Sequence, residues 1–501
     1  MTTLNADDHL PSIPAVPTNG VSSPTRLEAL SASEAAALYH AENGRTHARG
    51  VIPPMRHVVS LPGDLTEIAL ADRFADRYAD ELRYVAAWGT WVHYDGIRWR
   101  RERTHLVVDY AKHLCREAAT EADKPARALA IATSRMATAV LTLARADRRL
   151  AATDEQWDRD PWLLNTPDGT IDLRTGTLRA PDASDYVTKA TAVRPDPDWP
   201  IPLWLRVVSR MFERDGRSDV ALIAYMQRVL GYCLTGIIDE HAMWFLYGTG
   251  ANGKSVLLST IGGILACYHR IAPIETFAAS VGDRHPTELA MLRGARLVTA
   301  TETEEGRRWA EARIKALTGG DTIAARFMRQ DFFEYKPQFK IVIAGNHRPG
   351  LRSVDEAIRR RFNLVPFATT IPSQERDPEL GEKLRDEWPG ILAWLIQGCT
   401  LWQERGLEPP EVVTEATTAY LASEDTLADW IAECCYTGPR HRGAPGALYD
   451  SWKTWAEKAG EKPGSQRQFG NALDSRGFTR GRSNGERFHV GLALRPKGSD
   501  G

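Results

Sequence analysis

A glycine-rich octet in the middle of the chain, GTGANGKS at 248–255, is the feature that most restricts its fold. It matches the spacing Gly-x4-Gly-Lys-Ser without a gap. The apolar run 244–247 before it predicts a buried strand, and residues 256–265 after it predict the start of a helix. This order predicts an α/β core in which backbone N–H groups and a helix N-terminus hold phosphate oxygens.

The polar positions of the octet have expected roles. Lys254 would neutralise the β- and γ-phosphates of a nucleoside triphosphate, and the Ser255 hydroxyl would bind Mg²⁺. ATP and Mg²⁺ are therefore the expected cofactors. The positions expected to bind the nucleotide are Gly248, Thr249, Gly250, Ala251, Asn252, Gly253, Lys254 and Ser255.

A second predicted strand runs into acidic residues. Residues 295–301 are β-prone and lead into Glu302, with Glu304 two positions later. A carboxylate at the end of a strand beside the phosphate loop holds Mg²⁺ through water and polarises the attacking water. We expect Glu302 to be this catalytic and metal-binding acid, and Glu304 would share its face if the strand continues. A solvated acidic loop is the alternative interpretation of both residues.

Two further polar features follow later strands. Residues 340–345 predict a buried strand that ends at Asn346, whose amide would hold the attacking water; turn capping is the alternative. A run of three arginines, 359–361, follows a short predicted helix, and all three cannot face one site. Arginine stabilises charge on a transferring phosphoryl group, often from a neighbouring subunit. We expect Arg360 or Arg361 to do so, with a solvated basic helix end as the alternative.

The chain of 501 residues divides by pattern into segments. Residues 1–60 are proline-rich with one aromatic residue, which predicts a disordered tail. Residues 61–215 combine helical runs with aromatic strands and Asp-Gly or Thr-Gly turns, which predicts an α+β domain. We interpret its tryptophans as packing residues, with a base-stacking platform as the alternative. Residues 216–410 alternate strands and helices around the octet, which predicts an α/β domain with a parallel sheet.

Composition excludes several classes of protein. The net charge is −2, so any nucleic-acid surface has to be local. Six cysteines with no CxxC pair argue against a disulfide scaffold and a cysteine-based zinc site. No apolar run reaches the roughly 18 residues of a bilayer span, and the acidic N-terminus is unlike a signal peptide. We therefore expect a cytoplasmic protein without a membrane partner.

The C-terminal segment, 425–501, is the basic part of the chain. From residue 436 onward it holds twelve Lys or Arg against six Asp or Glu. Its pattern predicts helices at 447–459 and 465–476, then a β-hairpin around Asn484 and Gly485. Helix, helix and hairpin resemble a winged helix-turn-helix that binds duplex DNA, and a merely basic interaction domain is the alternative. The candidate DNA contacts are Arg467, Arg480 and Arg482.

In this order the motifs resemble those of superfamily 3 helicases, of the kind found in phage, plasmid and poxvirus primase-helicases. Asn252 within the loop and the 92 positions from Lys254 to Asn346 are typical of that family. The resemblance covers about residues 61–410 and implies an AAA+-like P-loop NTPase core preceded by an accessory domain. The matching runs are GTGANGKS (248–255), LVTATETEEG (297–306), LTGGDTIAARFMRQDFFEYKP (317–337), KIVIAGN (340–346) and RRRFNLVPF (359–367).

The resemblance also implies an ATP-driven ring, usually hexameric, that unwinds DNA at replication origins or forks. In such rings a hairpin between the acidic strand and the asparagine strand projects into the channel, and Thr322 to Pro337 is the matching stretch. A basic hairpin there would hold phosphates without reading bases, and an ordinary surface hairpin is the alternative. The candidate contacts are Lys315, Arg326, Arg329 and Lys336.

The expected function is thus replicative: an ATP-dependent DNA helicase of a phage, prophage or plasmid, acting as a homo-oligomer in the bacterial cytoplasm. Single-stranded DNA would occupy the channel and duplex DNA the C-terminal domain. Relatives with a primase domain carry it upstream, where this chain has about 60 residues without predicted structure, so we do not expect primer synthesis, and a separate primase or other replication proteins are candidate partners. The alternative is an ATP-regulated initiator that binds an origin or a partner protein without processive unwinding. A phosphate-loop kinase fits less well because the chain lacks a recognisable lid for a small molecule.

Overall fold

The computed structural model describes residues 64–279, 287–301, 307–329, 331–351, 354–459, 463–474, 476–483 and 485–496. The tail expected at 1–60 lies outside these residues, as do Glu302, Glu304 and Asn484. Among the helices of the described part, none has the length and apolarity required to span a bilayer.

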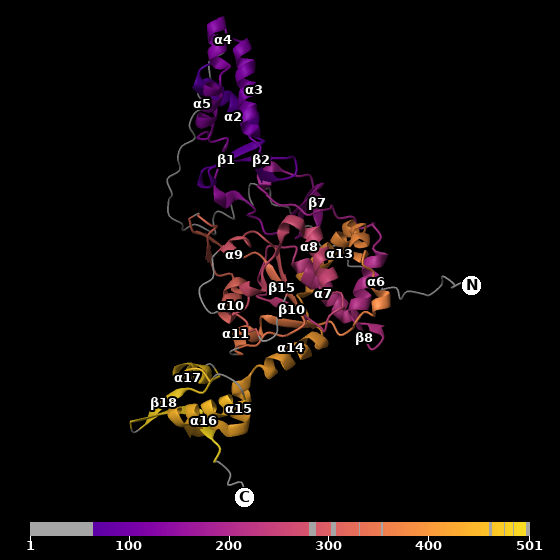
Figure 1. The fold of residues 1–501 in the computed structure, drawn as a ribbon, viewed down its shortest axis with the longest axis vertical. Helices are drawn as coiled ribbons and strands as arrows, with labels where there is room; N and C mark the ends of the chain where they lie inside the picture. Colours follow the sequence, from indigo (N-terminus) through magenta and orange to yellow (C-terminus); the bar gives the residue numbers. More distant parts are fainter. Residues whose placement is uncertain are drawn as a thin grey trace, which may run out of the picture. The chain divides into compact units, whose positions relative to one another are not determined.

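Four helices share one apolar cluster at the start of the described chain. Thr66 caps the first of them, since its hydroxyl accepts a hydrogen bond from the Ala69 N–H. Apolar side chains at helical spacing, such as Leu70 and Phe74, are fully buried in the cluster. Figure 1 shows these helices gathered beside β1 and β2. They are α2 (Glu67–Tyr78), α3 (Leu106–Thr120), α4 (Pro125–Ile131) and α5 (Ser134–Ala144).

A four-stranded sheet of order β3-β2-β1-β4 accompanies the four helices. The predicted turn at Asp95 and Gly96 joins two of its strands: Gly96 has φ 90°, and the Asp95 carboxylate accepts from the Arg98 N–H at 2.8 Å. Trp91 and Trp99 are buried, which agrees with their interpretation as packing residues. The strands are β1 (Leu82–Val85), β2 (Thr90–Tyr94), β3 (Trp99–Arg101) and β4 (Ala151–Ala152).

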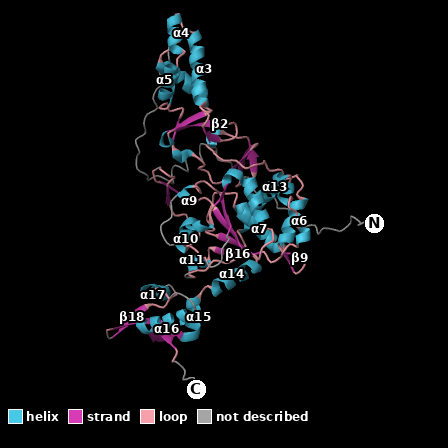
Figure 2. Cartoon of the chain, viewed as in Figure 1, coloured by secondary structure: helices cyan, strands magenta, loops and turns pink. Residues whose placement is uncertain are grey.

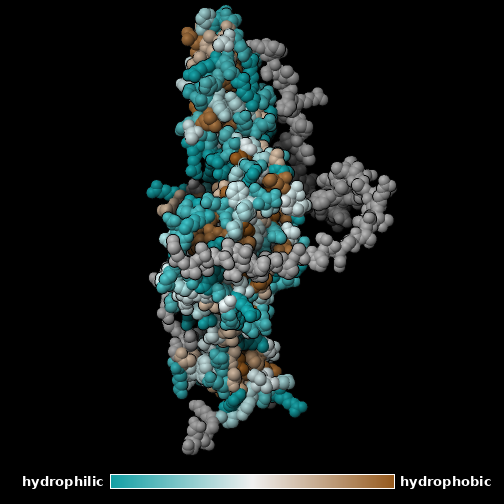
Figure 3. Space-filling model, turned by 90° about the vertical axis from the view of Figure 1, so that its right-hand side faces the viewer, coloured by the Kyte–Doolittle hydropathy of each residue, from teal (hydrophilic) through white to brown (hydrophobic). Residues whose placement is uncertain are grey.

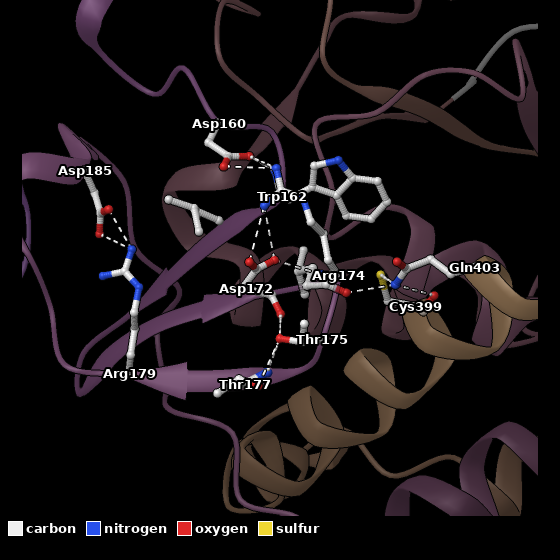
Figure 4. A network of polar contacts seen from close by, with 12 residues as sticks. Asp160, Trp162, Asp172, Arg174, Thr175, Thr177, Arg179, Asp185, Cys399 and Gln403 are labelled. Atoms are coloured by element: carbon white, nitrogen blue, oxygen red, sulfur yellow. Dashed lines mark hydrogen bonds and ion pairs between the residues drawn. The ribbon is translucent and has the colours of Figure 1, made fainter. Parts of the chain in front are cut away.

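A second antiparallel unit, β5-β6-β7, is tied to α13 (Trp388–Arg405) far along the chain. Arg174 in one of its turns donates to the carboxylates of Asp160, at 2.9 Å, and Asp172, at 3.3 Å (Figure 4). Gln403 of α13 donates to the carbonyl oxygen that precedes Arg174, at 2.8 Å. The strands are β5 (Leu163–Thr166), β6 (Gly169–Asp172) and β7 (Thr177–Arg179).

Five parallel strands form the central sheet, in the order β11-β12-β15-β10-β16. Successive side chains of a strand point to opposite faces, so a sheet covered by helices on both faces needs continuous apolar runs. Trp244 and Leu246 of β10 accordingly join one buried cluster, and Met243 and Phe245 join another. The strands are β10 (Met243–Tyr247), β11 (His269–Ile271), β12 (Leu297–Thr301), β15 (Lys340–Gly345) and β16 (Phe362–Pro366).

Helices cover both faces of the central sheet. Figure 2 shows its strands between α7 and α13 on one side and α10 and α11 on the other, in agreement with the two clusters. These helices are α6 (Pro202–Met211), α7 (Val220–Tyr232), α8 (Lys254–Leu265), α9 (Thr287–Ala290), α10 (Glu311–Gly319), α11 (Glu356–Arg359) and α12 (Leu380–Arg385), with α13. Two small hairpins complete this part: β8 (Glu213–Arg214) with β9 (Arg217–Ser218), and β13 (Ile323–Ala325) with β14 (Phe333–Tyr335).

The C-terminal segment has a core of its own, reached through α14 (Glu411–Ser423). Trp430, Trp452 and Phe469 lie at its centre, and its sheet has the order β17-β19-β18. The two predicted helices and the hairpin are present, and the structure adds α15 and β17 before them. The elements are α15 (Thr426–Cys434), β17 (Cys435–Gly443), α16 (Pro445–Lys458), α17 (Gln466–Asp474), β18 (Arg480–Ser483) and β19 (Glu486–Leu494). The molecular face in Figure 3 is mainly hydrophilic, with scattered apolar patches.

Candidate functional site

The glycine-rich loop leaves the carboxyl end of β10 and enters α8, whose first residue is Lys254. Two glycines are required by their surroundings. A Cβ on Gly248 would lie 2.4 Å from the Phe367 carbonyl oxygen, and one on Gly253 would lie 2.6 Å from the Met211 side chain. Gly253 also has φ 87°, a conformation that L side chains avoid. The absence of a Cβ at these two positions therefore allows the loop backbone to lie close to Phe367 and Met211.

The Lys254 ammonium is held inside this loop. It donates to the Gly248 carbonyl at 2.8 Å, to Asn252 Oδ1 at 3.0 Å and to Asn346 Oδ1 at 3.2 Å. Burial lowers the pKa of Lys254 to about 8, because all three of these acceptors are uncharged. The structure thus brings together Lys254 and Asn346, two residues that the sequence placed at one site from positions 92 apart.

The strand expected to carry the catalytic acid is not the direct neighbour of β10. In the sheet β15 lies between them, with Tyr247 level with Gly345 and Thr301 level with Ala344. The sequence did not predict this strand order, because it depends on contacts that local sequence does not encode. Thr301 still lines the same cavity as the loop, and Glu302, which follows it, lies outside the described residues.

A cavity of about 760 Å³ opens over the loop. One wall of the cavity consists of the loop and Asn346, which the sequence motifs predicted. The other wall consists of α6 and the segment 371–380, which no motif predicted. Although α6 lies within the range predicted as the α+β domain, its buried face shares a cluster with β10 and α8. The cavity-lining residues that sequence reasoning missed include Leu203, Arg206, Val207, Arg210, Ile371, Glu375 and Arg376.

Polar contacts hold this second wall against the loop. The Ile371 N–H donates to the Ala251 carbonyl at 2.8 Å. Arg210 of α6 donates to the carboxylate of Glu375 at 3.0 Å and to that of Glu213 at 2.8 Å. No sequence signal could have identified the contacts of Ile371 and Glu375, because the segment 371–380 meets the loop and α6 only in the folded chain. Across the described residues, no group of three or more His, Cys, Asp or Glu side chains forms a metal-binding cluster.

The three arginines after α11 have different environments. Arg359 donates to the buried carboxylate of Asp425 at 3.1 Å. Arg361 is 6% exposed and donates to Thr318 Oγ1 at 3.0 Å and to the Ala357 carbonyl at 2.7 Å. Arg360 is exposed. The expectation treated Arg360 and Arg361 as equivalent, but Arg361 is engaged within its own chain, so of these two residues Arg360 is the one that presents its side chain at the surface.

The expected hairpin is present as β13 and β14, and its candidate contacts differ in position. Arg326, Arg329 and Lys336 are exposed on it or beside it. Lys315 instead lies on α10, where it forms an ion pair with Asp355. Lys315 is therefore a poorer candidate for a DNA contact than the three hairpin cations.

The three candidate contacts of the C-terminal segment are all exposed. Arg467 lies on α17, and Arg480 and Arg482 lie on β18. Arg480 donates to Asn471 Oδ1 at 2.8 Å and pairs with Asp474 at 2.7 Å, so part of its charge is compensated.

Comparison with known families covers two separate stretches of the chain. Residues 71–213 match the family described as "D5 N terminal like", and residues 246–361 match a "Family of unknown function (DUF5906)". The second stretch contains the glycine-rich loop and the arginine run.

The similar curated proteins come from large DNA viruses. Putative helicase L207/L206 of Acanthamoeba polyphaga mimivirus is 27% identical over 55% of this chain and 31% of its own length. Putative helicase 022R of Frog virus 3 (isolate Goorha) is 28% identical over 43% of this chain and 24% of its own length. The chain thus matches only about a quarter to a third of these relatives. Among solved structures, the apo C terminal region (305–718) of NrS-1 has a similar fold, with TM-score 0.50 and 10% identity. That likeness covers 85% of this chain and 100% of the other.

Fold and site together define a mixed α/β protein whose parallel sheet carries a glycine-rich loop at the mouth of a large cavity. The two family matches and the viral relatives support a relationship between this chain and the phage and viral primase-helicases. The resemblance found in the sequence is confirmed at this level.

Proposed function

We propose that this chain is a DNA helicase motor that hydrolyses ATP with Mg²⁺ in the cavity over the glycine-rich loop. One observation carries the proposal: the Lys254 ammonium lies within the loop and 3.2 Å from Asn346 Oδ1, at the carboxyl edge of a parallel sheet. Ligands of open α/β sheets bind at this edge. The cavity volume of about 760 Å³ falls in the usual range of a small-molecule site.

The donor set fits a triphosphate and its metal. Backbone N–H groups of the loop and the first turn of α8 would hold phosphate oxygens, and Lys254 would exchange its neutral acceptors for charged ones. Ser255 is exposed in that first turn and would ligate Mg²⁺, which when bound offsets the charge of the phosphates. Asn346 would orient the attacking water and Glu302 would polarise it. The apolar part of the second wall, Leu203, Val207 and Ile371, would accommodate the base.

The elements observed in each predicted segment support assigning a separate domain role to that segment. We assign 216–410, together with α6, to the P-loop core, and the rest of 61–215 to an accessory domain. The order α15-β17-α16-α17-β18-β19 and the sheet β17-β19-β18 support a winged helix-turn-helix at 425–501 that binds duplex DNA. Arg467 on α17 and Arg482 on β18 would contact phosphates.

The assembly proposed is a homo-oligomeric ring, with hexamers as the expected size. Arg360 would reach the nucleotide of the neighbouring subunit, and the cations Arg326, Arg329 and Lys336 of the hairpin would hold single-stranded DNA. The second candidate function, an initiator that uses ATP only to assemble, is favoured by Lys315 being paired with Asp355 away from the hairpin, because an assembly switch needs no basic hairpin.

ATP hydrolysis by Lys254→Ala tests the proposed site. The variant should retain its circular dichroism spectrum and lose ATP hydrolysis, since the side chain would act on phosphate. Lys112→Ala is the matched control, because Lys112 is a half-exposed lysine on α3 paired with Asp109, and it should hydrolyse ATP as the wild type does. Hydrolysis near the wild-type rate by Lys254→Ala would remove the assignment.

A further inference from the structure

The hairpin β13–β14 exposes a group of apolar side chains at its tip. Phe332 is 59% exposed, Met328 69% and Phe327 39%. The residues of a connection between strands are usually polar or glycine, and exposed apolar groups that gather in one place mark binding surfaces. The strands themselves behave in the ordinary way, since Ala325 and Tyr335 are buried. The exposed apolar surface is therefore a property of the tip.

Arginines are paired with aromatic rings in this tip. The guanidinium of Arg326 lies 4.7 Å from the ring centroid of Phe332, and that of Arg293 lies 5.1 Å from the centroid of Phe333. The rings of Phe327 and Phe333 stack with their centroids 5.7 Å apart and their planes at 28°. Ring faces and positive charge are thus presented together over a few residues.

The base of the hairpin is fixed while the tip faces outward. The Tyr335 hydroxyl donates to the Leu289 carbonyl at 2.6 Å, and Ile323 joins the apolar cluster of the central sheet. Arg329 has φ 61°, which turns the chain within the connection. An anchored base positions the tip as a unit, so its side chains can act together on one ligand.

We infer that the tip formed by Arg326, Phe327, Met328, Arg329 and Phe332 binds unpaired bases of single-stranded DNA by stacking, in addition to contacting phosphates. The inference rests on the proposed function and adds base stacking to the phosphate contacts expected of the hairpin. Every nucleobase has a flat apolar face that fits an exposed phenylalanine, and each stacked base typically raises affinity about fivefold or more. In duplex DNA these faces are hidden by neighbouring base pairs. The rings therefore select single strands, whereas the arginines attract either form.

The test compares two single strands of equal length and charge: an oligothymidylate and its abasic analogue, which keeps the phosphates and lacks the bases. The wild-type protein should bind the oligothymidylate about tenfold more tightly or better. Phe332→Leu keeps an apolar side chain and removes the ring, so it should lose most of that preference. Phe332→Tyr keeps the ring and should keep the preference. Affinity for the abasic strand should be the same in all three proteins.

Salt dependence separates the rings from the arginines. Arg329→Gln should reduce the slope of log affinity against log salt concentration by about 0.7, the value for one phosphate contact on a single strand. Phe332→Leu should leave the slope unchanged, because stacking releases no counterions. Leu129→Ala is the matched control: it removes an apolar side chain that is 74% exposed on α4, and it should change neither preference nor slope.

Equal affinity of the wild type for the two strands would overturn the inference, as would full base preference in Phe332→Leu. Loss of oligomer assembly in Phe332→Leu would overturn it too, because the tip would then be a contact between subunits. ATP hydrolysis in the same preparations keeps the two claims apart. Hydrolysis without base preference removes the inference alone, whereas a wild-type protein without hydrolysis removes the proposed function.

Discussion

At Lys254, burial and the proposed task act in opposite directions. The loop withdraws the ammonium from water and lowers its pKa to about 8, whereas phosphate binding requires the charged form. The octet predicts which residue occupies this place. It does not predict the pKa, which depends on how deeply the folded chain buries the ammonium. For this residue, the sequence therefore predicts the identity of the phosphate-binding side chain, and the structure determines its pKa.

The pKa of Lys254 leads to a pH dependence of ATP affinity. Phosphate oxygens favour the charged lysine and raise its pKa in the complex, so above about pH 8 binding takes up a proton. Affinity should fall as pH rises through about 8, by up to about tenfold per pH unit until the pKa of the complex is reached. Lys254→Arg stays charged throughout and should show a flat profile. Calorimetric titration of ATP between about pH 7 and pH 10 measures this, and a flat wild-type profile would contradict it.

Gly253→Ala tests the geometry of the loop. The new Cβ would meet the Met211 side chain at 2.6 Å in a backbone with φ 87°, so the folded state should lose about 1–2 kcal/mol and ATP affinity should fall. Gly381→Ala is the control, because Gly381 lies in α12 with no atom within 4 Å of the added Cβ. That change should be neutral or stabilising by up to about 1 kcal/mol. Urea unfolding of both variants gives the comparison; equal stabilities would show that the loop can move.

At the scale of elements, the sequence correctly predicted those turns, strands and helices that short-range interactions stabilise. The hairpin at Asp95 and Gly96, the strand 340–345 and the helix after the octet are present because turn chemistry and apolar periodicity act over a few residues. The position of β15 between β10 and β12 was not predictable, since register and order follow from contacts across the whole sheet. The exposure of Phe332 was not predictable either, because an aromatic residue in a β-prone run is usually buried.

Asp425 is an element-scale feature with no sequence signal. It caps α15, and its buried carboxylate pairs with Arg359, the last residue of α11, and with Arg476 after α17. These partners lie 66 and 51 positions away. The adjacent Glu424 accepts from the Leu351 N–H at 2.8 Å. This junction therefore connects the arginine run to the C-terminal segment.

Asp425→Asn should destabilise that junction. The amide can still cap the helix, but it leaves two arginines without a carboxylate, and breaking a buried pair costs about 3–5 kcal/mol. Glu117→Gln is the control, because its ion pair with Arg77 is exposed and should contribute less than about 1 kcal/mol. Urea unfolding followed by tryptophan fluorescence gives the midpoint, to which the buried Trp430 and Trp452 of the C-terminal segment contribute among the fifteen tryptophans of the chain. An Asp425→Asn midpoint no lower than that of Glu117→Gln would refute the assigned role.

At the scale of the whole molecule, the relationship to primase-helicases is supported and the assembly is a proposal. The chain matches about a quarter to a third of its curated viral relatives, so their full activities do not transfer to it. The sequence motifs identified the family because they are short and specific. Ring formation depends on surfaces that no motif describes, and Arg360 is the exposed residue on which a shared active site would depend.

Mixing two inactive proteins tests whether Arg360 acts in trans. Arg360→Ala should bind ATP normally and turn over about 10³-fold more slowly. Combined with Lys254→Ala, it should recover part of the ATP hydrolysis, since some interfaces would then pair an intact loop with an intact arginine. Arg361→Ala, which removes buried hydrogen bonds, should instead lower stability. Co-assembly of the two inactive proteins without recovered hydrolysis would mean that Arg360 acts in cis or has no catalytic part.

The central claim is that ATP hydrolysis over the glycine-rich loop drives strand separation, and unwinding of a forked DNA duplex measures it most directly. The wild-type protein should separate the strands with ATP and Mg²⁺, and it should fail when either is omitted. Lys254→Ala should bind the fork and leave it intact. A wild-type protein that hydrolyses ATP, binds the fork and never separates its strands would contradict the account and favour the initiator.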